Sequence, residues 1–399
     1  MRLAGKKIVL GLTGGIACYK VAELTRLLGK AGADVHVVMT QAATQFITPV
    51  TMQALSGNPV FTDAWDARIA NNMPHIDLTR DADAIIIAPC STDFISKLAH
   101  GVCDDLLSTL CIASPATVPL MIAPAMNVEM WQNPATQRNM ALIRGDGILV
   151  MGPARGDQAC GETGLGRMLE PQEMLAEIIA AQTAPSLRGK RLLLTAGPTF
   201  EPIDPVRGIT NLSSGKMGYA IATAAWEAGA EVTLISGPVA LAAPYGVQRI
   251  SVQTAQQMHD AVMQALQRQR FDSFIAVAAV ADWKVANASD QKLKKTSAAD
   301  LPQLLFEQNP DILASVAALP DAPYCVGFAA ESENLLAYGE EKRTRKHIPL
   351  LVGNIGHQTF GKDDNELILF DERGHKTLPR ADKATLAQQL VTELSARLG

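Results

Sequence analysis

The sequence predicts an α/β protein with two doubly wound, Rossmann-like domains, each built on a parallel sheet. Residues 6–40 and 190–237 share one order: an apolar strand, a glycine-containing turn, a helix and a second apolar strand. That order is typical of the first βαβ unit of a doubly wound sheet. Both helices end in Ala-Gly-Ala, then an acidic residue and valine, at 31–35 and 228–232. Glycine favours the end of a helix, and the β-branched run after it favours a buried parallel strand.

The chain length also favours two domains, because 399 residues exceed what one hydrophobic core usually spans. Between the two openings, residues 180–190 lose their apolar periodicity and contain Pro185, Ser186 and Gly189. We therefore place the boundary near residue 187, which gives domains 1–187 and 188–399. The further buried strands expected are 83–89, 120–126 and 147–153 in the first domain and 273–282, 324–330, 349–354 and 366–370 in the second.

Composition excludes several classes of function. Hydrophobic residues make up 48% and charged residues 19%, which is ordinary for a soluble protein that forms a core. A net charge of −5 argues against nucleic-acid and anionic-membrane partners. The apolar runs are too short to cross a bilayer, and we expect no signal peptide, because the basic first residues run directly into a strand and a glycine turn. Small molecules are the partners that remain.

The six cysteines have no CxxC pair and no zinc-ligand spacing. This pattern predicts reduced, mostly buried thiols in a cytoplasmic protein. Cys160 is the exception, because the glycine-rich segment 158–168 suits the presentation of a thiol better than its burial.

The first glycine turn does not match a dinucleotide site. Gly11, Gly14 and Gly15 miss the G-x-G-x-x-G spacing, and Thr40 stands where an acidic residue would hold the ribose. These departures disfavour a nicotinamide-dependent dehydrogenase. A hydroxyl at a strand end, facing a helix N-terminus, better suits a single phosphate, which leaves a mononucleotide open.

Three segments of the first domain carry candidate chemistry: MPHIDLTR with His75, PAMNVEMW with Asn127, and QACGETGLGRM with Cys160. Taken singly, a histidine is usually a structural residue and an asparagine after a strand is usually a turn former. In this combination and order they resemble the flavin-dependent cysteine decarboxylases. Over its whole length the chain resembles the bacterial bifunctional phosphopantothenoylcysteine decarboxylase/phosphopantothenate–cysteine ligases of coenzyme A synthesis.

The resemblance implies a flavodoxin-like N-terminal domain that binds FMN. In the implied reaction, the cysteine thiol is oxidised to a thioaldehyde, carbon dioxide leaves, and the resulting enethiol is protonated and reduced. His75 would be the essential histidine beside substrate and flavin, and Asn127 would bind the substrate carboxylate. Cys160 would be the proton donor on a flap that closes over the substrate. The FMN contacts implied are Gly14, Gly15, Ile16, Thr40, Ser91, Thr92 and Ala125.

One stretch departs from the family. Residues 90–94 read Cys-Ser-Thr-Asp-Phe, where the family usually has Ala-Thr-Ala-Asn-Thr. Ser91 can still donate to a phosphate. The carboxylate of Asp93 would repel the FMN phosphate unless it points away or is paired.

The second domain opens with an irregular glycine loop, TAGPTFEPIDPVRGITNLSSGKMG. It is not a Walker A loop, because Met217 follows Gly-Lys where serine or threonine is required. Its end at a helix start can still present N–H groups and hydroxyls to an anion. The alternative is a surface loop in which Ser213 or Ser214 caps the helix.

The motif order of this domain resembles phosphopantothenate–cysteine ligase. The resemblance implies an acyl-cytidylate formed from CTP with Mg²⁺, which cysteine then attacks. Lys292 would assist its formation and Asn211 would bind it. Phe200 stands where the family often has arginine, the choice of CTP over ATP rests on the resemblance alone, and the metal ligands are unassigned. The nucleotide contacts implied are Ala276, Val277, Ala278, Asp282, Pro310, Asp311, Ile312, Leu313, Phe328, Lys342 and Lys346.

Together these motifs predict an enzyme that makes 4′-phosphopantetheine from 4′-phosphopantothenate, cysteine and CTP. The alternative is a flavin-binding regulatory or scaffold protein whose catalysis has lapsed. Such a protein should have lost His75, Cys160 or Lys292, and all three are present. The resemblance further implies a homo-oligomer, a dodecamer built from decarboxylase trimers and ligase dimers.

Overall fold

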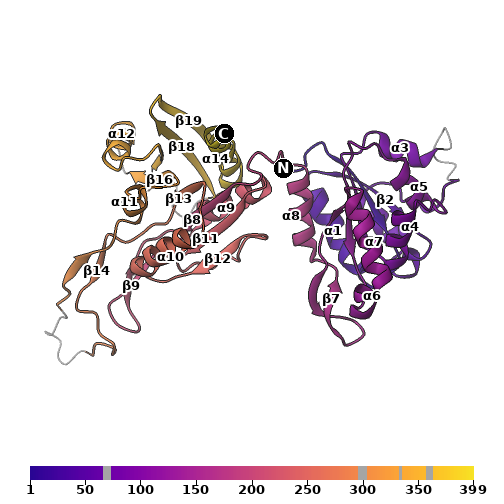
Figure 1. Cartoon of the computed structure of the whole chain (residues 1–399), viewed down its shortest axis with the longest axis horizontal. Coiled ribbons are helices and arrows are strands. Elements are labelled where there is room, and N and C mark those ends of the chain that lie inside the picture. The colour runs from indigo at the N-terminus through magenta and orange to yellow at the C-terminus, as the bar shows by residue number, and fades with distance from the viewer. Residues whose placement is uncertain (66–72, 295–302, 332–334, 356–362) are drawn as a thin grey trace. The chain divides into compact units, whose positions relative to one another are not determined.

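The computed structural model describes residues 1–65, 73–294, 303–331, 335–355 and 363–399. It divides the chain into two compact units, Met1–Thr183 and Ala184–Gly399 (Figure 1). The division falls close to residue 187, where apolar periodicity is lost in the sequence. Each unit has a mainly parallel sheet with helices packed against it, so the predicted α/β class is confirmed.

The N-terminal sheet has the order β2-β1-β3-β4-β5, and all its pairings are parallel. Its central strand β3 is buried along its whole length, which is why the run AIIIAPC contains no charged residue. The strands are β1 (Lys7–Leu12), β2 (Asp34–Met39), β3 (Ala84–Cys90), β4 (Leu120–Pro124) and β5 (Leu149–Val150).

Amphipathic helices cover this sheet. In α1 the side chains of Val21, Leu24 and Leu28 recur at helical spacing and are fully buried. The helices are α1 (Cys18–Lys30), η1 (Ala43–Gln45), α2 (Pro49–Ser56), α3 (Pro74–Arg80), α4 (Thr92–His100), α5 (Leu106–Ala113), α6 (Val128–Gln132), α7 (Pro134–Gly145) and α8 (Pro171–Ala181).

A two-stranded antiparallel hairpin, β6 (Ala154–Asp157) and β7 (Thr163–Arg167), leaves the end of this sheet. Cys160 lies in its turn. Four of the six cysteines are buried, whereas Cys103 is exposed like Cys160.

The C-terminal sheet has eight strands in the order β12-β11-β8-β13-β16-β17-β18-β19. It is parallel as far as β17, and β18 and β19 extend it as antiparallel edge strands. The strands are β8 (Arg191–Ala196), β11 (Glu231–Ser236), β12 (Gln248–Ser251), β13 (Ser273–Ala276), β16 (Tyr324–Glu331), β17 (Leu350–Ile355), β18 (Asp364–Asp371) and β19 (Gly374–Asp382).

Two hydrophobic clusters fill the space between this sheet and its helices. One joins the sheet to α9 and α14, and the other joins it to α10 and α11. At Gly218 a Cβ would lie 2.5 Å from the Cβ of Ala196, so glycine allows α9 to pack closely on β8. The helices are α9 (Lys216–Glu227), α10 (Ala255–Arg268), α11 (Ile312–Ala317), α12 (Leu335–Arg345) and α14 (Lys383–Leu398), and the short hairpins are β9 (Phe200–Pro202) with β10 (Gly208–Thr210) and β14 (Trp283–Val285) with β15 (Phe306–Gln308).

Among the helices of the described residues, none is long and apolar enough to span a membrane.

Candidate functional site

The predicted flavin contacts gather at the carboxyl edge of the N-terminal sheet. The sheet order reverses between β1 and β3, and ligands of doubly wound sheets bind outside the strand ends at such a point. The segments that follow β1, β2, β3 and β4 carry these residues, of which Thr92 is the first residue of α4: Gly14, Gly15, Ile16, Thr40, Ser91, Thr92 and Ala125.

Thr13 ties the two central loops of this edge together. Its Oγ1 donates to the carbonyl oxygen of Pro89 at 2.7 Å and accepts from the backbone N–H of Ser91 at 2.9 Å. Because these loops lead into α1 and α4, the two helix N-termini are fixed on neighbouring strands. Each N-terminus carries partial positive charge, so the pair suits an anion.

The donors at these helix starts fit a phosphate group. In the part of the chain that the structure describes, the backbone N–H groups of Gly14, Gly15 and Ile16 donate no intramolecular hydrogen bond. Ser91 caps α4 by accepting from the N–H of Phe94 at 3.3 Å, which leaves its hydroxyl proton for a ligand. Thr40 is a half-buried hydroxyl at the end of β2, the strand beside β1.

Asp93 meets one of the two conditions under which its carboxylate is compatible with a phosphate, because it is paired with a lysine. Its side chain is 79% exposed, and its Oδ2 lies 3.9 Å from Nζ of Lys97. Burial lowers the pKa of Lys97, but hydrogen bonds to Asp104 at 2.7 Å and Asp105 at 3.0 Å raise it above its ordinary value. Lys97 therefore stays charged and offsets part of the negative charge of Asp93.

Asn127 and Cys160 meet through one carboxylate. Asn127 caps α6, since its Oδ1 accepts from the N–H of Met130 at 3.0 Å. Its Nδ2 donates to Oε2 of Glu162 at 3.3 Å. The thiol of Cys160 donates to the same oxygen at 3.5 Å. The structure thus brings together two of the three predicted decarboxylase residues and adds Glu162, which sequence reasoning did not assign.

The root of the β6–β7 hairpin is anchored separately. Oε1 of Gln158 accepts from the N–H of Val128 at 2.9 Å, and its Nε2 donates to the carbonyl of Leu165 at 3.2 Å. The carbonyl of Gly166 accepts from the N–H of Met126 at 3.0 Å. At Gly166 a Cβ would lie 2.5 Å from the Met126 oxygen, so only glycine fits this contact. The tip that carries Cys160 is exposed, as expected for a flap.

His75 lies elsewhere in the N-terminal unit. It is in the first turn of α3, which packs against α5. Figure 1 shows α3 and the β6–β7 hairpin at opposite ends of this unit. One chain by itself therefore does not bring His75 to Cys160.

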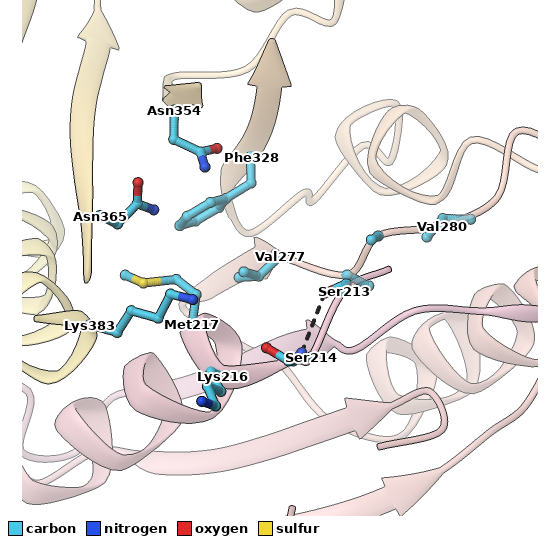
Figure 2. Close-up of a pocket in the computed structure, with 13 residues that line it drawn as sticks. Ser213, Ser214, Lys216, Met217, Val277, Val280, Phe328, Asn354, Asn365 and Lys383 are labelled. Carbon is cyan, nitrogen blue, oxygen red and sulfur yellow. Dashed lines mark hydrogen bonds between the residues drawn. The ribbon is translucent and has the colours of Figure 1, made fainter. Parts of the chain in front are cut away.

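The C-terminal unit has a pocket at the carboxyl edge of its sheet, where the strand order reverses between β8 and β13. Figure 2 shows Asn354, Asn365 and Lys383 on one side of this pocket, with Ser213 and Ser214 on the other. The predicted residues Val277, Ala278 and Phe328 line the pocket, and Ala276 ends the strand that leads into it. The lining is Ser213, Ser214, Gly215, Lys216, Met217, Val277, Ala278, Ala279, Val280, Phe328, Asn354, Asn365 and Lys383.

Asn211 is joined to the wall of this pocket. Its Nδ2 donates to the carbonyl oxygen of Ala279 at 3.0 Å. Lys216 lies at the rim, where Nζ is 2.5 Å from Oδ1 of the exposed Asp363. Burial lowers the pKa of Lys383, and the nearby Lys216 lowers it further.

Sequence reasoning did not assign Asn354, Asn365 or Lys383 to a site. Asn354 could have been found, because it follows the buried run PLLV just as Asn127 follows another buried strand. Asn365 and Lys383 offered no such signal, because they lie where the antiparallel edge and α14 begin.

A second group of predicted nucleotide contacts lies around the start of α11. Oδ1 of Asp311 accepts from the N–H of Ala314 at 3.0 Å, and Nζ of Lys346 is 2.9 Å from its Oδ2. Ile312 and Leu313 have buried side chains in the core, so only their backbone can face a ligand. The remaining members are Lys342, Asp282 and Pro310. Lys342 lies one helical turn before Lys346. Asp282 accepts a hydrogen bond at its carbonyl oxygen from the N–H of Asn309, the residue before Pro310.

Lys292 is exposed and does not line the pocket in the described chain. The next residue, Leu293, is held by both of its backbone groups. Its N–H donates to Oδ2 of the buried Asp204 at 3.1 Å, and its carbonyl accepts from Nη2 of Arg207 at 2.9 Å. Nε of Arg207 also donates to Asp204 at 3.0 Å, and this bond holds the pKa of Asp204 well below its ordinary value.

The ring of Phe200 lies directly over Gly208 in the β9–β10 hairpin, so this position is filled by packing. Among the described residues, no group of three or more His, Cys, Asp or Glu side chains is arranged to hold a metal ion. The ligands of a Mg²⁺ ion thus stay unassigned.

Two family models match the chain in succession. "Flavoprotein" matches residues 2–183, and "DNA/pantothenate metabolism flavoprotein C-terminal domain" matches residues 187–398. The Vibrio vulnificus "Coenzyme A biosynthesis bifunctional protein CoaBC" is 48% identical over 401 residues, covering 100% of this chain and 99% of that protein. The Escherichia coli protein of the same description is 47% identical over 404 residues, covering 100% and 98%. A solved C-terminal domain of a CoaBC protein is 36% identical and covers 54% of this chain and 98% of that one, with a TM-score of 0.46.

Proposed function

The chain belongs to the CoaBC family of bifunctional coenzyme A biosynthesis proteins, and from this premise we propose the reactions, cofactors and residues of its two domains. It is a decarboxylase with a flavoprotein domain, joined to a ligase. The C-terminal domain makes 4′-phosphopantothenoylcysteine from 4′-phosphopantothenate, cysteine and CTP, with Mg²⁺. The N-terminal domain decarboxylates that product to 4′-phosphopantetheine with bound FMN.

One observation carries the decarboxylase proposal: Asn127 and Cys160 meet through Glu162 at the sheet edge where α1 and α4 begin and where the N–H groups of Gly14, Gly15 and Ile16 face no acceptor of the described chain. FMN would supply the oxidising power and the electron sink for loss of carbon dioxide. Its phosphate would take the N–H groups of Gly14, Gly15 and Ile16 and the hydroxyl of Ser91. Thr40, Thr92 and Ala125 would line the rest of the site.

The side chains at the flap have distinct tasks. The amide of Asn127 donates to the substrate carboxylate and holds it in place. Cys160 holds a proton on Sγ and delivers it to the enethiol that decarboxylation leaves. The β6–β7 hairpin covers the substrate and excludes water during this transfer.

His75 acts, in this proposal, at the site of a neighbouring copy. Its helix α3 lies at the far end of the N-terminal unit from the flap of the same chain, which supports a site built between copies in a decarboxylase trimer. The family resemblance adds ligase dimers, which together with the trimers would form a dodecamer.

The ligase proposal rests on the pocket beside Asn211. Lys292 assists attack of the 4′-phosphopantothenate carboxylate on the α-phosphate of CTP, and Asn211 holds the acyl-cytidylate for cysteine. Backbone groups of Ala276, Val277 and Ala278 and the ring of Phe328 contact the nucleotide. Further contacts come from Asp282, Pro310, Asp311, Ile312, Leu313, Lys342 and Lys346.

We also propose a cytoplasmic protein, since all six of its cysteines are free thiols in the structure. The chromophore released by heating the purified protein tests the flavin proposal, and it should have the mass and absorbance of FMN. Protein that held no flavin after reconstitution would contradict it. With 4′-phosphopantothenate and cysteine present, CTP should yield CMP and pyrophosphate, and cleavage of ATP in its place would contradict the choice of nucleotide.

A further inference from the structure

The amide of Asn127 holds a carboxylate of its own chain. Its Nδ2 donates to Oε2 of Glu162 at 3.3 Å, and both side chains are half-buried. Under the proposed function this amide is the group that binds the carboxylate of the substrate. A side chain of the flap therefore occupies the position that the substrate carboxylate must take.

The same oxygen of Glu162 also accepts from the thiol of Cys160 at 3.5 Å. One carboxylate thus contacts both the group that binds the substrate and the group that protonates it. A substrate can replace only one of these two contacts. Its carboxylate can bind the Asn127 amide in place of Glu162, whereas the thiol of Cys160 lies on the same hairpin as Glu162 and can keep its contact.

Glu162 is not needed to hold the hairpin to the domain. The root is fixed by Gln158, which bonds to Val128 and Leu165, and by the backbone bond between Gly166 and Met126. The contact between Glu162 and Asn127 can therefore break while the hairpin stays attached.

We propose that Glu162 is a positioning residue that occupies the carboxylate-binding amide of Asn127 until the substrate displaces it. This inference rests on the proposed function of the N-terminal domain. Once displaced, Glu162 keeps the Cys160 thiol as its donor and orients Sγ as the substrate arrives. After decarboxylation the product has no carboxylate for Asn127, so Glu162 returns to the amide and product release is favoured.

The test compares two unreactive ligands in which a hydroxyl replaces the thiol. 4′-Phosphopantothenoylserine retains the carboxylate, and 4′-phosphopantothenoylethanolamine lacks it. Dissociation constants for both are measured by calorimetry on FMN-loaded, full-length protein. The readout is the ratio of the two dissociation constants, because a general change in folding or in flavin binding would alter both constants by the same factor.

Glu162→Ala should bind the serine ligand about fivefold more tightly, the factor that one net hydrogen bond provides, and leave the ethanolamine ligand unchanged. Glu162→Gln keeps the shape of the side chain but offers a weaker, neutral acceptor, so its gain should be about twofold. Glu129→Ala is the matched control, because it removes an exposed carboxylate two residues from Asn127. Its ratio should equal that of the wild type.

A Glu162→Ala ratio equal to the wild-type ratio would overturn the inference, as would an equal gain in Glu129→Ala. Either result would leave the decarboxylase proposal standing. A wild-type protein that bound neither ligand would overturn both the inference and the proposed decarboxylase site.

Discussion

Asn127 and Cys160 donate to the same atom: Oε2 of Glu162 lies 3.3 Å from Nδ2 of Asn127 and 3.5 Å from Sγ of Cys160. Asn127 follows a buried strand of the parallel sheet, and Cys160 lies in the turn of a hairpin. Glycine-mediated packing at the root of the hairpin makes the meeting possible, since Gly166 contacts the Met126 carbonyl with no room for a side chain. The proposed proton donor is thereby presented at the carboxyl end of the sheet, where we propose that the flavin and substrate bind.

Replacement of Cys160 by serine should separate decarboxylation from protonation. Serine is a much weaker acid than the thiol, so 4′-phosphopantetheine formation should fall about 100-fold or more while carbon dioxide is still released. Mass spectrometry should detect the enethiol. Cys103→Ser, a change at the other exposed thiol, is the control and should behave as wild type. Undiminished product from Cys160→Ser would show that another group donates the proton.

Mixing two variants that each fail to make 4′-phosphopantetheine should restore its formation if His75 acts across copies. His75→Asn and Cys160→Ser each spoil one component, but a mixed trimer contains sites with both components intact. Unfolding the two proteins together and refolding them with FMN should recover up to about a quarter of wild-type activity, because each site draws its two residues from random copies. Refolding each variant alone is the control. Absence of recovery from properly assembled mixtures would place both residues in one chain.

Asp93 should have little effect on the affinity of the N-terminal domain for FMN. Its carboxylate is exposed and lies beside Lys97, so Asp93→Asn should change the dissociation constant of FMN by less than about twofold. Ser91→Ala, which removes a hydroxyl at the same helix start, should weaken FMN about fivefold. Fluorescence titration of the apoprotein compares the two variants. A tenfold gain in affinity for Asp93→Asn would show that the carboxylate faces the phosphate.

Asp204 should matter to the ligase through the segment that carries Lys292. Asp204→Asn weakens the hold on the backbone of Leu293, so it should slow acyl-cytidylate formation about tenfold. Lys292→Gln should abolish that step, and both variants should decarboxylate supplied 4′-phosphopantothenoylcysteine normally. Rapid-quench measurement of the cytidylate gives the rates. If decarboxylation fell together with ligation, the assignment of the two reactions to separate sites would be wrong.

Asp204 should also contribute to stability in a pH-dependent way. Hydrogen bonds from Arg207 hold its pKa in the folded state below the unfolded value of about 3.9. Its stabilisation is therefore present above that pH and is lost as the pH falls toward the folded pKa. The difference in guanidinium midpoint between wild type and Asp204→Asn should be largest at neutral pH and shrink below about pH 4. Asp290→Asn, an exposed control, should show little difference, and a pH-independent gap for Asp204→Asn would contradict the account.

The sequence predicted the long parallel strands because an uninterrupted apolar composition indicates burial. It did not predict β12, whose residues are partly exposed, and the buried strand expected over 147–153 is only the partly exposed Leu149–Val150. The run AIIIAPC can satisfy its side chains only between two layers of helices, and it is β3. The same reasoning placed Asn127 at the carboxyl edge of the sheet, because residues that follow such strands lie at that edge. Val277 and Ala278 were assigned by the family resemblance alone, inside an expected strand 273–282 that ends at Ala276 in the structure.

Elements held by tertiary contacts could not be predicted in this way. The β6–β7 hairpin has no apolar alternation, and it is fixed by Gln158 reaching back to Val128. β19 contains Pro379, which argues against a central strand and is tolerated because β19 is at the edge of the sheet. Neither the contact of Glu162 with Asn127 nor the place of Lys383 in the pocket follows from any local pattern.

The most direct test of the two-domain account is mass spectrometry of the products that the purified, FMN-loaded protein makes from 4′-phosphopantothenate, cysteine, Mg²⁺ and either CTP or ATP. We predict 4′-phosphopantetheine with CTP, since both sites must then act in order. No product with either nucleotide, from folded protein, would contradict the account, and accumulation of 4′-phosphopantothenoylcysteine alone would contradict its decarboxylase half.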